Sequence, residues 1–188
     1  MEHLFSINAE GGPLLCLDAG AAQIWKGSEE GSSDYLRLCA KFDAEPGIRA
    51  TMIRVGDRSA VAWEMGGPGT ADAFITNDGV IWIVRAWFDP EGPEAIEQLA
   101  SARASSDMEI GGIEIRSEFL AVLWAPETGQ HISLSSKHQV QRIPGTSIDD
   151  SGFLLKVRNG WYRCRNEEVD DHSVHARRLS LIPQLTPA

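Results

Sequence analysis

The densest group of ionisable side chains lies close to the C-terminus, where an acidic run at 167–171 is followed by His172 and His175. Carboxylates and imidazoles at short spacing can hold a metal ion or transfer protons. In an extended strand, however, His172 and His175 would point to opposite faces, and the neighbouring Arg177 and Arg178 would repel a cation. We therefore interpret the run as a solvated hairpin tip or as a docking surface for basic side chains of a partner. The candidate partner-binding carboxylates are Glu167, Glu168, Asp170 and Asp171, together with the smaller acidic pair Asp149 and Asp150.

Motifs of the common enzyme classes are missing from the sequence. It contains no P-loop, no dinucleotide-binding fingerprint, no His-Glu-x-x-His zinc motif and no Gly-x-Ser-x-Gly nucleophile elbow. Gly66-Gly67-Pro68-Gly69 is rich in glycine, but no lysine follows it, so we interpret it as a loop and not as a phosphate cradle. The widely spaced Cys16, Cys39 and Cys164 favour reduced core residues over disulfides or a zinc ribbon. We expect no enzymatic activity, no cofactor and no bound metal.

Tryptophan is unusually frequent, with six residues in the chain. Trp63, Trp82 and Trp124 lie in the middle of apolar segments, and we expect them in the core. Trp87 precedes an Asp-Pro pair, and Trp161 follows an Asn-Gly turn, so both are candidates for partial exposure. Exposed tryptophan is enriched at binding hot spots. We therefore add Trp87 and Trp161 to the candidate partner-binding residues.

Composition restricts the kind of partner. The chain has 188 residues, 43% hydrophobic content and a net charge of −10, which suits a folded, acidic domain. Such a charge disfavours nucleic acids and anionic membranes and favours a basic protein partner. No apolar run is long enough to span a bilayer, and the N-terminus lacks the pattern of a secretory signal, so we expect a cytoplasmic protein. The sequence leaves open whether the protein is a monomer or a homodimer.

The secondary-structure pattern is mostly β. Two hairpins are predicted, one over 49–64 around Gly56-Asp57 and one over 71–88 around Asn77-Asp78-Gly79, and we expect their four strands in one antiparallel sheet. Helical spacing appears at 93–102 and more briefly at 20–25, while 35–42 fits either a helix or a strand. Further strands are predicted at 108–115, 119–124, 131–135, 153–157, 161–165 and 174–182, with Asn159-Gly160 forming a hairpin over 153–165.

These elements predict an α+β fold, mainly an antiparallel β-sheet or sandwich with one or two helices packed on it. The polar segment at 101–107 is the best candidate joint between an N-terminal α+β lobe (1–104) and a C-terminal β-rich, sandwich-like lobe (105–188). No repeat with the period of a solenoid or propeller is visible.

The first quarter of the chain carries a dispersed set of small, aromatic and charged residues with characteristic order and spacing. They are Gly11-Gly12-Pro13 before an apolar strand, Trp25-x-Gly27, and Asp34-Tyr35-x-Arg37-x-Cys39. This set resembles the Immunity protein 21 family of bacterial polymorphic-toxin systems, and the similarity continues into 78–87 and weakens afterwards. The resemblance implies a small cytoplasmic protein that binds and neutralises a cognate toxin. We interpret the set as structural, with the glycines permitting unusual φ angles and Asp34 capping the segment that follows.

Three functions remain open at this point. An immunity protein would present a contiguous acidic face, and a basic, nuclease-like toxin is one partner that would fit such a face. A small-ligand-binding or regulatory β-rich module would have a concave pocket lined by Trp87 and Trp161. A hydrolase would bring titratable groups of the C-terminal half together with perturbed pKa values.

Overall fold

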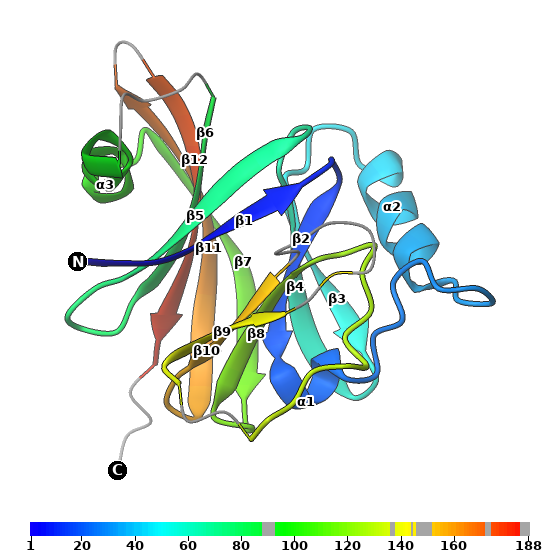
Figure 1. Ribbon diagram of the computed structural model, residues 1–188. Coiled ribbons are helices and arrows are strands. Elements are labelled where there is room, and N and C mark those ends of the chain that lie inside the picture. The colour runs from blue at the N-terminus through cyan, green and yellow to red at the C-terminus, as the bar shows by residue number, and fades with distance from the viewer. Residues whose placement is uncertain (88–92, 136–137, 144, 146–151, 172–173, 185–188) are drawn as a thin grey trace.

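The computed structural model describes residues 1–87, 93–135, 138–143, 145, 152–171 and 174–184; at 93–95, 170–171 and 174 it describes the backbone only. Within this part of the chain, two antiparallel sheets of six strands pack face to face (Figure 1). Sheet A has the order β1 (Glu2–Ala9), β5 (Gly69–Ile75), β6 (Ile81–Trp87), β12 (Val174–Pro183), β11 (Gly160–Asp171) and β7 (Ser106–Ile115). Sheet B has the order β3 (Ala50–Val55), β4 (Arg58–Glu64), β2 (Pro13–Asp18), β8 (Phe119–Trp124), β10 (Gly152–Lys156) and β9 (Val140–Ile143).

The main core fills the space between the sheets, and all strands of the first half and most of the second half contribute side chains to it. The central strands of sheet B show why. Every residue of β2 and of β8 is buried, because the strands lie at the centre of the sheet and both faces are covered. Along β2, Leu14 and Cys16 point toward sheet A, whereas Leu15 and Leu17 point into a second cluster on the outer face.

Three helices in the described residues cover the outer faces. The short α1 (Ala19–Ala22) and the longer α2 (Asp34–Ala44) lie over sheet B, and α3 (Pro93–Ser101) lies over sheet A (Figure 1). Asp18 begins α1 by accepting hydrogen bonds from the backbone amides of Gly20 and Ala21. The helices therefore bury the outward-facing apolar residues of the central strands.

In each sheet, the three strands on one side of the centre have counterparts in mirrored order on the other side. We call β1–β6 the first repeat and β7–β12 the second repeat, because each strand of the first has a counterpart six strands later. From the centre outward, sheet A runs β6, β5, β1 on one side and β12, β11, β7 on the other. Sheet B runs β2, β4, β3 on one side and β8, β10, β9 on the other. The two repeats are thus related by an approximate twofold axis that passes between β6 and β12 and between β2 and β8.

The registers obey the same symmetry. In sheet A, Ile81 pairs with Leu181 and Ile83 with Leu179, so each pair is the image of the other. In sheet B, Leu14 pairs with Trp124 and Asp18 with Leu120 in the same manner. The edge pairs agree as well, since β5 begins opposite Ala9 at Gly69 and β11 begins opposite Ile115 at Gly160.

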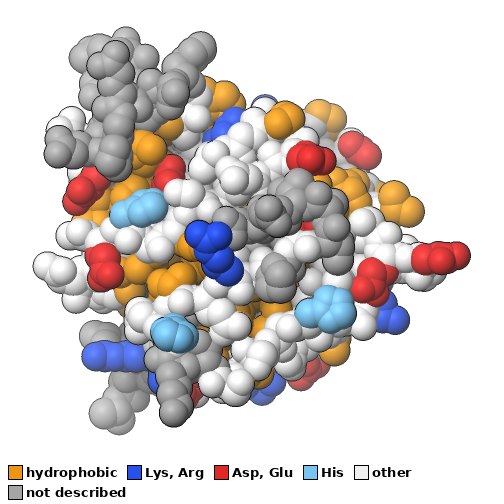
Figure 2. Space-filling model, viewed as in Figure 1, with side chains coloured by type: hydrophobic (Ala, Val, Ile, Leu, Met, Phe, Trp, Pro, Cys, Tyr) orange, Lys and Arg blue, Asp and Glu red, His pale blue; other side chains and the backbone are white. Residues whose placement is uncertain are grey.

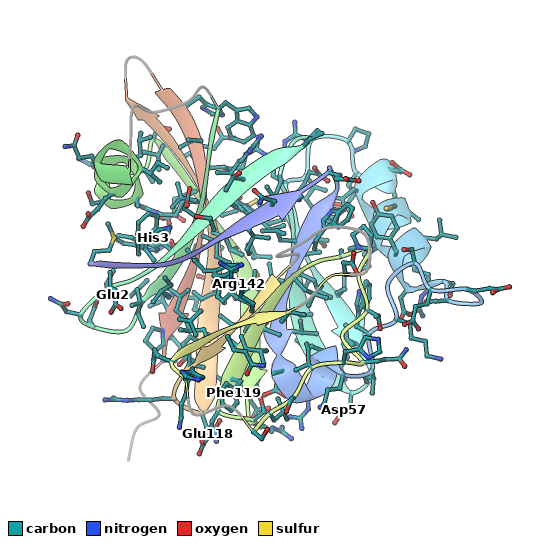
Figure 3. The ribbon with its side chains drawn as sticks, viewed as in Figure 1. Glu2, His3, Asp57, Glu118, Phe119 and Arg142 are labelled. Carbon is teal, nitrogen blue, oxygen red and sulfur yellow. The ribbon has the colours of Figure 1, made fainter. Side chains whose placement is uncertain are left out.

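The turns before β2 and β8 show the correspondence in backbone conformation. Gly12 immediately precedes β2 with φ 76°, and Glu118 immediately precedes β8 with φ 63°. Glu118 is the one residue other than glycine with positive φ in the described part of the chain. Figure 3 labels Glu118 and Phe119 at their end of the sandwich, and Figure 1 shows the β1–β2 turn at the opposite end. The two corresponding turns therefore both require the left-handed conformation, at a glycine before β2 and at Glu118, for which it is unfavourable, before β8.

The α+β sandwich predicted from the sequence is confirmed, and so are both hairpins of the first repeat. The prediction that their strands share one sheet was wrong, because β3 and β4 lie in sheet B and β5 and β6 in sheet A. The predicted hairpin over 153–165 was also wrong. β10 pairs with β8 and β9, and the Asn159-Gly160 connection passes from sheet B to sheet A.

Other segments differ in detail. The ambiguous segment at 35–42 is helical, within α2, and the predicted helix at 93–102 is α3. The segment predicted as a strand at 131–135 is irregular, and β11 continues as a strand through the acidic run to Asp171. The division expected near residue 104 falls between the two repeats, which share both sheets and one core.

Candidate functional site

The residues of the family resemblance come together around the start of α2. An added Cβ at Gly12 would lie 2.7 Å from the hydroxyl oxygen of Tyr35, so the glycine leaves room for the tyrosine. The indole of Trp25 is buried and donates a hydrogen bond to the carbonyl of Ala125 at 2.8 Å. The carbonyl of Gly27 accepts a hydrogen bond from the Tyr35 amide at 3.2 Å. Positions 12–35, separated along the chain, thus form one contact region.

The segment at 125–129 holds this region against sheet B. The amide of Ser28 donates to the carbonyl of Pro126 at 2.8 Å, and the amide of Gly129 donates to the carbonyl of Trp25 at 2.9 Å. The start of β2 is held by the same segment, because the Ala125 amide donates a hydrogen bond to the carbonyl of Pro13 at 3.0 Å. The Gly11 carbonyl accepts a hydrogen bond from the indole of Trp124.

Asp34 differs from the role expected for it. The N-cap of α2 is Ser33, and Asp34 is the first helical residue. Its carboxylate accepts a hydrogen bond from the Lys26 amide at 3.1 Å and forms an ion pair with Arg37. Asp34 therefore fixes the connection between α1 and α2, while Cys39, one turn further, is partly exposed and unoxidised. Burial, together with a hydrogen bond to Cys39, raises the pKa of Tyr35 to about 12.

The outer surface of the α1–α2 segment carries unusually exposed apolar side chains. Leu36 is 69% exposed and Ile24 is 53% exposed. Acidic residues accompany them, since Glu29 and Glu30 are also exposed. Figure 2 shows acidic and hydrophobic side chains gathered on the side where α2 projects. A hollow of about 240 Å³ lies between α2 and β3; its lining is Trp25, Asp34, Arg37, Leu38, Lys41, Ile53 and Arg54.

The acidic run contributes less to the surface than its sequence indicates. Glu167 is buried, and both of its oxygens accept hydrogen bonds from the guanidinium of Arg178, at 2.9 and 3.1 Å. Burial would raise the pKa of Glu167, but the hydrogen bonds from Arg178 and Ser180 hold the pKa below its usual value. Arg178 also donates to the carbonyls of Ala100 and Ala102 at the end of α3. Glu167 is therefore an internal anchor and does not belong to an exposed acidic surface.

The remaining candidate carboxylates are placed as follows. Glu168 is partly exposed and approaches Arg177 at 3.9 Å. Asp170 and Asp171 lie at the end of β11, but their side chains are outside the described residues, as are Asp149 and Asp150 entirely. The described residues thus give no contiguous acidic face built from this set.

Trp87 and Trp161 lie at opposite ends of sheet A, and they do not share a pocket. Trp87 is surrounded by cations: the guanidinium carbon of Arg177 lies 4.7 Å from its ring centroid and that of Arg85 lies 5.7 Å away. Arg85 donates to the carbonyls of Pro68 and Thr70 at 2.7 and 3.0 Å. Burial lowers the pKa of both arginines. At this end of the sandwich, the protein's own side chains occupy the space beside the glycine-rich connection.

Trp161 lines an open cleft at the other end. The cleft has a volume of about 770 Å³ and lies between the β5–β6 turn, the β10–β11 connection and the end of β12. The Trp161 side chain is half exposed. The lining is Ile75, Asn77, Asp78, Gly79, Gln139, Lys156, Val157, Arg158, Asn159, Gly160, Trp161, Tyr162, Pro183 and Gln184. Apart from Trp161, none of these residues was predicted as a site residue from the sequence.

The described residues show no other grouping with obvious chemistry. They contain no cluster of three or more His, Cys, Asp or Glu side chains that could hold a metal ion. Burial raises the pKa of the Cys16 thiol well above its usual value and raises that of Cys164 to about 12, which suits inert core residues. Of the helices described, none is long and apolar enough to cross a membrane.

No protein-family model matches this chain, and neither a curated protein nor a solved structure matches it.

Proposed function

We propose that the chain is an immunity protein of a bacterial toxin system, a cytoplasmic, non-catalytic protein that binds a cognate toxin and blocks its action. The observation that supports this most directly is the convergence of the residues that resemble the Immunity protein 21 family. Gly12, Trp25, Gly27, Asp34 and Tyr35 all take part in seating the α1–α2 segment on the sandwich. The residues that carry the resemblance thus belong to one structural unit.

The unit has the properties of a recognition element. Its inner side is fixed by hydrogen bonds from Trp25, Ser28 and Gly129, so its backbone is preorganised. Its outer side presents Leu36 and Ile24 to solvent. An exposed apolar side chain beside charged groups is the usual composition of a binding patch with a polar rim. The second repeat has no helix between β8 and β9 in its described residues, so this surface belongs to one repeat only.

The partner that fits is a basic protein. The net charge of −10 attracts a positively charged toxin at long range, and Glu29 and Glu30 add two exposed carboxylates in the connection between α1 and α2. A nuclease toxin must carry a positive surface to hold phosphate, so it is the class most suited to this inhibitor. Docking through the α1–α2 segment replaces the docking through the acidic run that the sequence favours.

The test is binding to the product of the neighbouring toxin gene, measured by calorimetry across salt concentrations. We expect affinity to fall as salt rises, and Leu36→Asp to weaken binding roughly tenfold or more, which corresponds to about 1.4 kcal/mol. Met108→Asp is the matched control, because Met108 is 46% exposed on β7 and lies outside the α1–α2 segment. Absence of binding at low salt, with both proteins folded, would refute the immunity function; equal losses for the two variants would refute the proposed face.

A further inference from the structure

The open cleft between the β5–β6 turn, the β10–β11 connection and the end of β12 is a further binding site. We infer that it takes a medium-chain carboxylate, with the aliphatic chain between the two sheets and the carboxylate at Arg158. The cleft is separate from the α1–α2 segment, so this inference is independent of toxin binding. It depends on where the cleft lies, on which of its polar groups are already hydrogen-bonded, and on the charge at its rim.

The cleft opens into the space between the two sheets. Sheet A contributes Ile75, Tyr162 and Pro183 to its lining, and the segment that follows β10 of sheet B contributes Val157. Ile75 and Val157 are partly buried and pack against the main core, and Tyr162 belongs to that core. The cleft is therefore an opening of the core, at the end of the sandwich where β12 ends (Figure 1). Its volume of about 770 Å³ is within the usual range for small-molecule sites.

Trp161 and Lys156 border the cleft but direct their side chains elsewhere. Tyr162 faces the main core, so Trp161 faces the outer side of sheet A, where its ring lies 3.4 Å from an added Cβ at Gly112. In β10, Leu155 faces the main core, so Lys156 faces the outer side of sheet B. The interior of the cleft is therefore formed by the core-facing side chains, which are mainly aliphatic.

The opposite end of the sandwich is closed by large side chains. There, the guanidinium carbons of Arg85 and Arg177 lie 5.7 and 4.7 Å from the ring centroid of Trp87. At the cleft, Gly79 and Pro183 are neighbours, and an added Cβ at Gly79 would lie 3.9 Å from the Pro183 ring. Small residues therefore leave the core open at this end, and an apolar group from outside can cover it.

The polar side chains around the cleft are mostly bound to the protein itself. The side-chain amides of Gln139 and Gln184 donate to backbone carbonyls at 3.0 and 3.1 Å. The Tyr162 hydroxyl donates to the Arg158 carbonyl at 2.9 Å, and the side-chain oxygen of Asn159 accepts a hydrogen bond from a backbone amide at 2.7 Å. Few groups are therefore left to recognise a polar ring. An aliphatic chain can enter without leaving these donors and acceptors unpaired.

Arg158 provides positive charge at the rim. Its side chain is exposed, and in the described part of the chain no carboxylate forms an ion pair with it. Burial raises the pKa of Tyr162, and the charge of Arg158 opposes that rise, so the guanidinium is close to a hydroxyl of the cleft lining. The carboxylate of the described lining, that of Asp78, accepts a hydrogen bond from Thr76. A carboxylate of the ligand can thus form a charge-assisted hydrogen bond with Arg158.

The experiment is calorimetric titration of the whole chain with octanoate, hexanoate and 1-octanol in turn. We expect octanoate to bind. Hexanoate should bind roughly tenfold more weakly, because two fewer methylene groups are buried. 1-Octanol should also bind roughly tenfold more weakly, because it has the same chain without the charge that Arg158 recognises.

Variants test the two ends of the ligand separately. Arg158→Gln should weaken octanoate binding about tenfold and remove the preference over 1-octanol, whereas Arg103→Gln, exposed and outside the cleft, should bind normally. Ile75→Trp and Val157→Trp each fill the cleft from a different segment of its lining, and each should weaken octanoate binding at least about tenfold. Circular dichroism and melting temperatures show whether these variants are folded.

The site is overturned if octanoate does not bind, or if the folded tryptophan variants bind it as the unmodified chain does. Equal affinity for octanoate and hexanoate would contradict burial of the aliphatic chain. Equal affinity for octanoate and 1-octanol would contradict recognition of the carboxylate by Arg158. Toxin binding, measured on the same preparations, reports separately on the proposed function.

Discussion

The two ends of the sandwich have the same backbone framework and different contents. At the end of the first repeat, Arg85 and Arg177 lie against Trp87 and close the space beside the Gly66–Gly69 connection. The twofold relation makes Ile81 the counterpart of Leu179, and continuing along these strands makes Pro183 and Gly79 the counterparts of the two arginines. At the end where Pro183 and Gly79 lie, a cleft remains. Strand order and register set where a cleft can form, whereas two side chains decide whether it does.

The outer faces of sheet B provide a second contrast between the repeats. After β2, the chain forms α1 and α2, which hydrogen bonds of Trp25 and Asp34 hold in place. After β8, the described residues up to β9 are irregular, and the segment at 125–129 serves as the seat of the other repeat's helices. One repeat thus carries the projecting surface while the other supports it.

The largest expected effect concerns a cluster present in the second repeat alone. Arg178→Met would leave the carboxylate of Glu167 buried without its partner, and we expect the free energy of unfolding to fall by about 3–5 kcal/mol. Urea denaturation measures this. The counterpart of Arg178 is Val80, where Val80→Ala should lower the free energy by about 1 kcal/mol. Recovery of most of the stability in the double variant Arg178→Met with Glu167→Met would show that the unpaired charge is the cause; no recovery would contradict it.

The closed end should depend on Arg85 more than the open end depends on Pro183. Arg85→Met removes two hydrogen bonds to backbone carbonyls and a contact with Trp87, and we expect a loss of about 2 kcal/mol. Pro183→Ala should change stability by about 0.5 kcal/mol or less, as surface substitutions usually do. Denaturant unfolding of both variants gives the comparison, and equal losses would mean that the contrast between the ends has no energetic basis.

The paired turns predict opposite responses to substitution. Gly12→Ala forces a residue with a Cβ into φ 76° and against the Tyr35 hydroxyl, so stability should fall by about 1–2 kcal/mol. Glu118→Gly relieves the same conformation at φ 63°, and stability should rise by about 0.5–1 kcal/mol. Thermal unfolding followed by circular dichroism distinguishes them; melting temperatures that shift in the same direction would show that the two turns are not equivalent.

The smallest effect is on pH dependence. Folding lowers the pKa of Glu167, so between the folded and unfolded pKa values the unfolded chain binds more protons. The stabilisation from this group is complete above the unfolded-state pKa and is lost as pH falls through the folded-state pKa. Denaturation midpoints measured from pH 6 downward, a range around the usual carboxylate pKa of about 4.3, should decrease less steeply in the double variant Arg178→Met with Glu167→Met. An unchanged slope would contradict a role for Glu167 in acid stability.

Local patterns were sufficient to predict much of the fold. Gly56-Asp57 and Asp78-Gly79 indicate two hairpins that are present, and the alternation in β6 indicates a strand covered on both faces. The distribution of those hairpins between sheets was not accessible, because it depends on pairings between distant segments such as β2 with β8. The twofold repeat was equally hidden, since corresponding core positions share apolar character and not identity, as with Cys16 and Val122.

The candidate site was predictable in part. An Asn-Gly turn before Trp161 indicated exposure, and the side chain is exposed. The same reasoning placed Glu167 on the surface, and it failed because Arg178 and Ser180 reach it from the neighbouring strand. The cleft itself could not be predicted from local sequence, because its volume depends on small residues at Gly79 and Pro183, which are brought together by tertiary structure.

The mirrored order of the two repeats in each sheet affects how much one repeat can lose in packing without separating from the other. The contact between the repeats, through β6 with β12 and β2 with β8, has the self-complementary form of the interface in a symmetric dimer. Here both repeats are on one chain, so their effective concentration is set by the connection between β6 and β7 and not by how much protein is present. The two repeats therefore stay associated even when one of them has fewer packed side chains at its outer end. A covalently joined pair of this kind can close one end with arginine side chains and leave a cleft at the other.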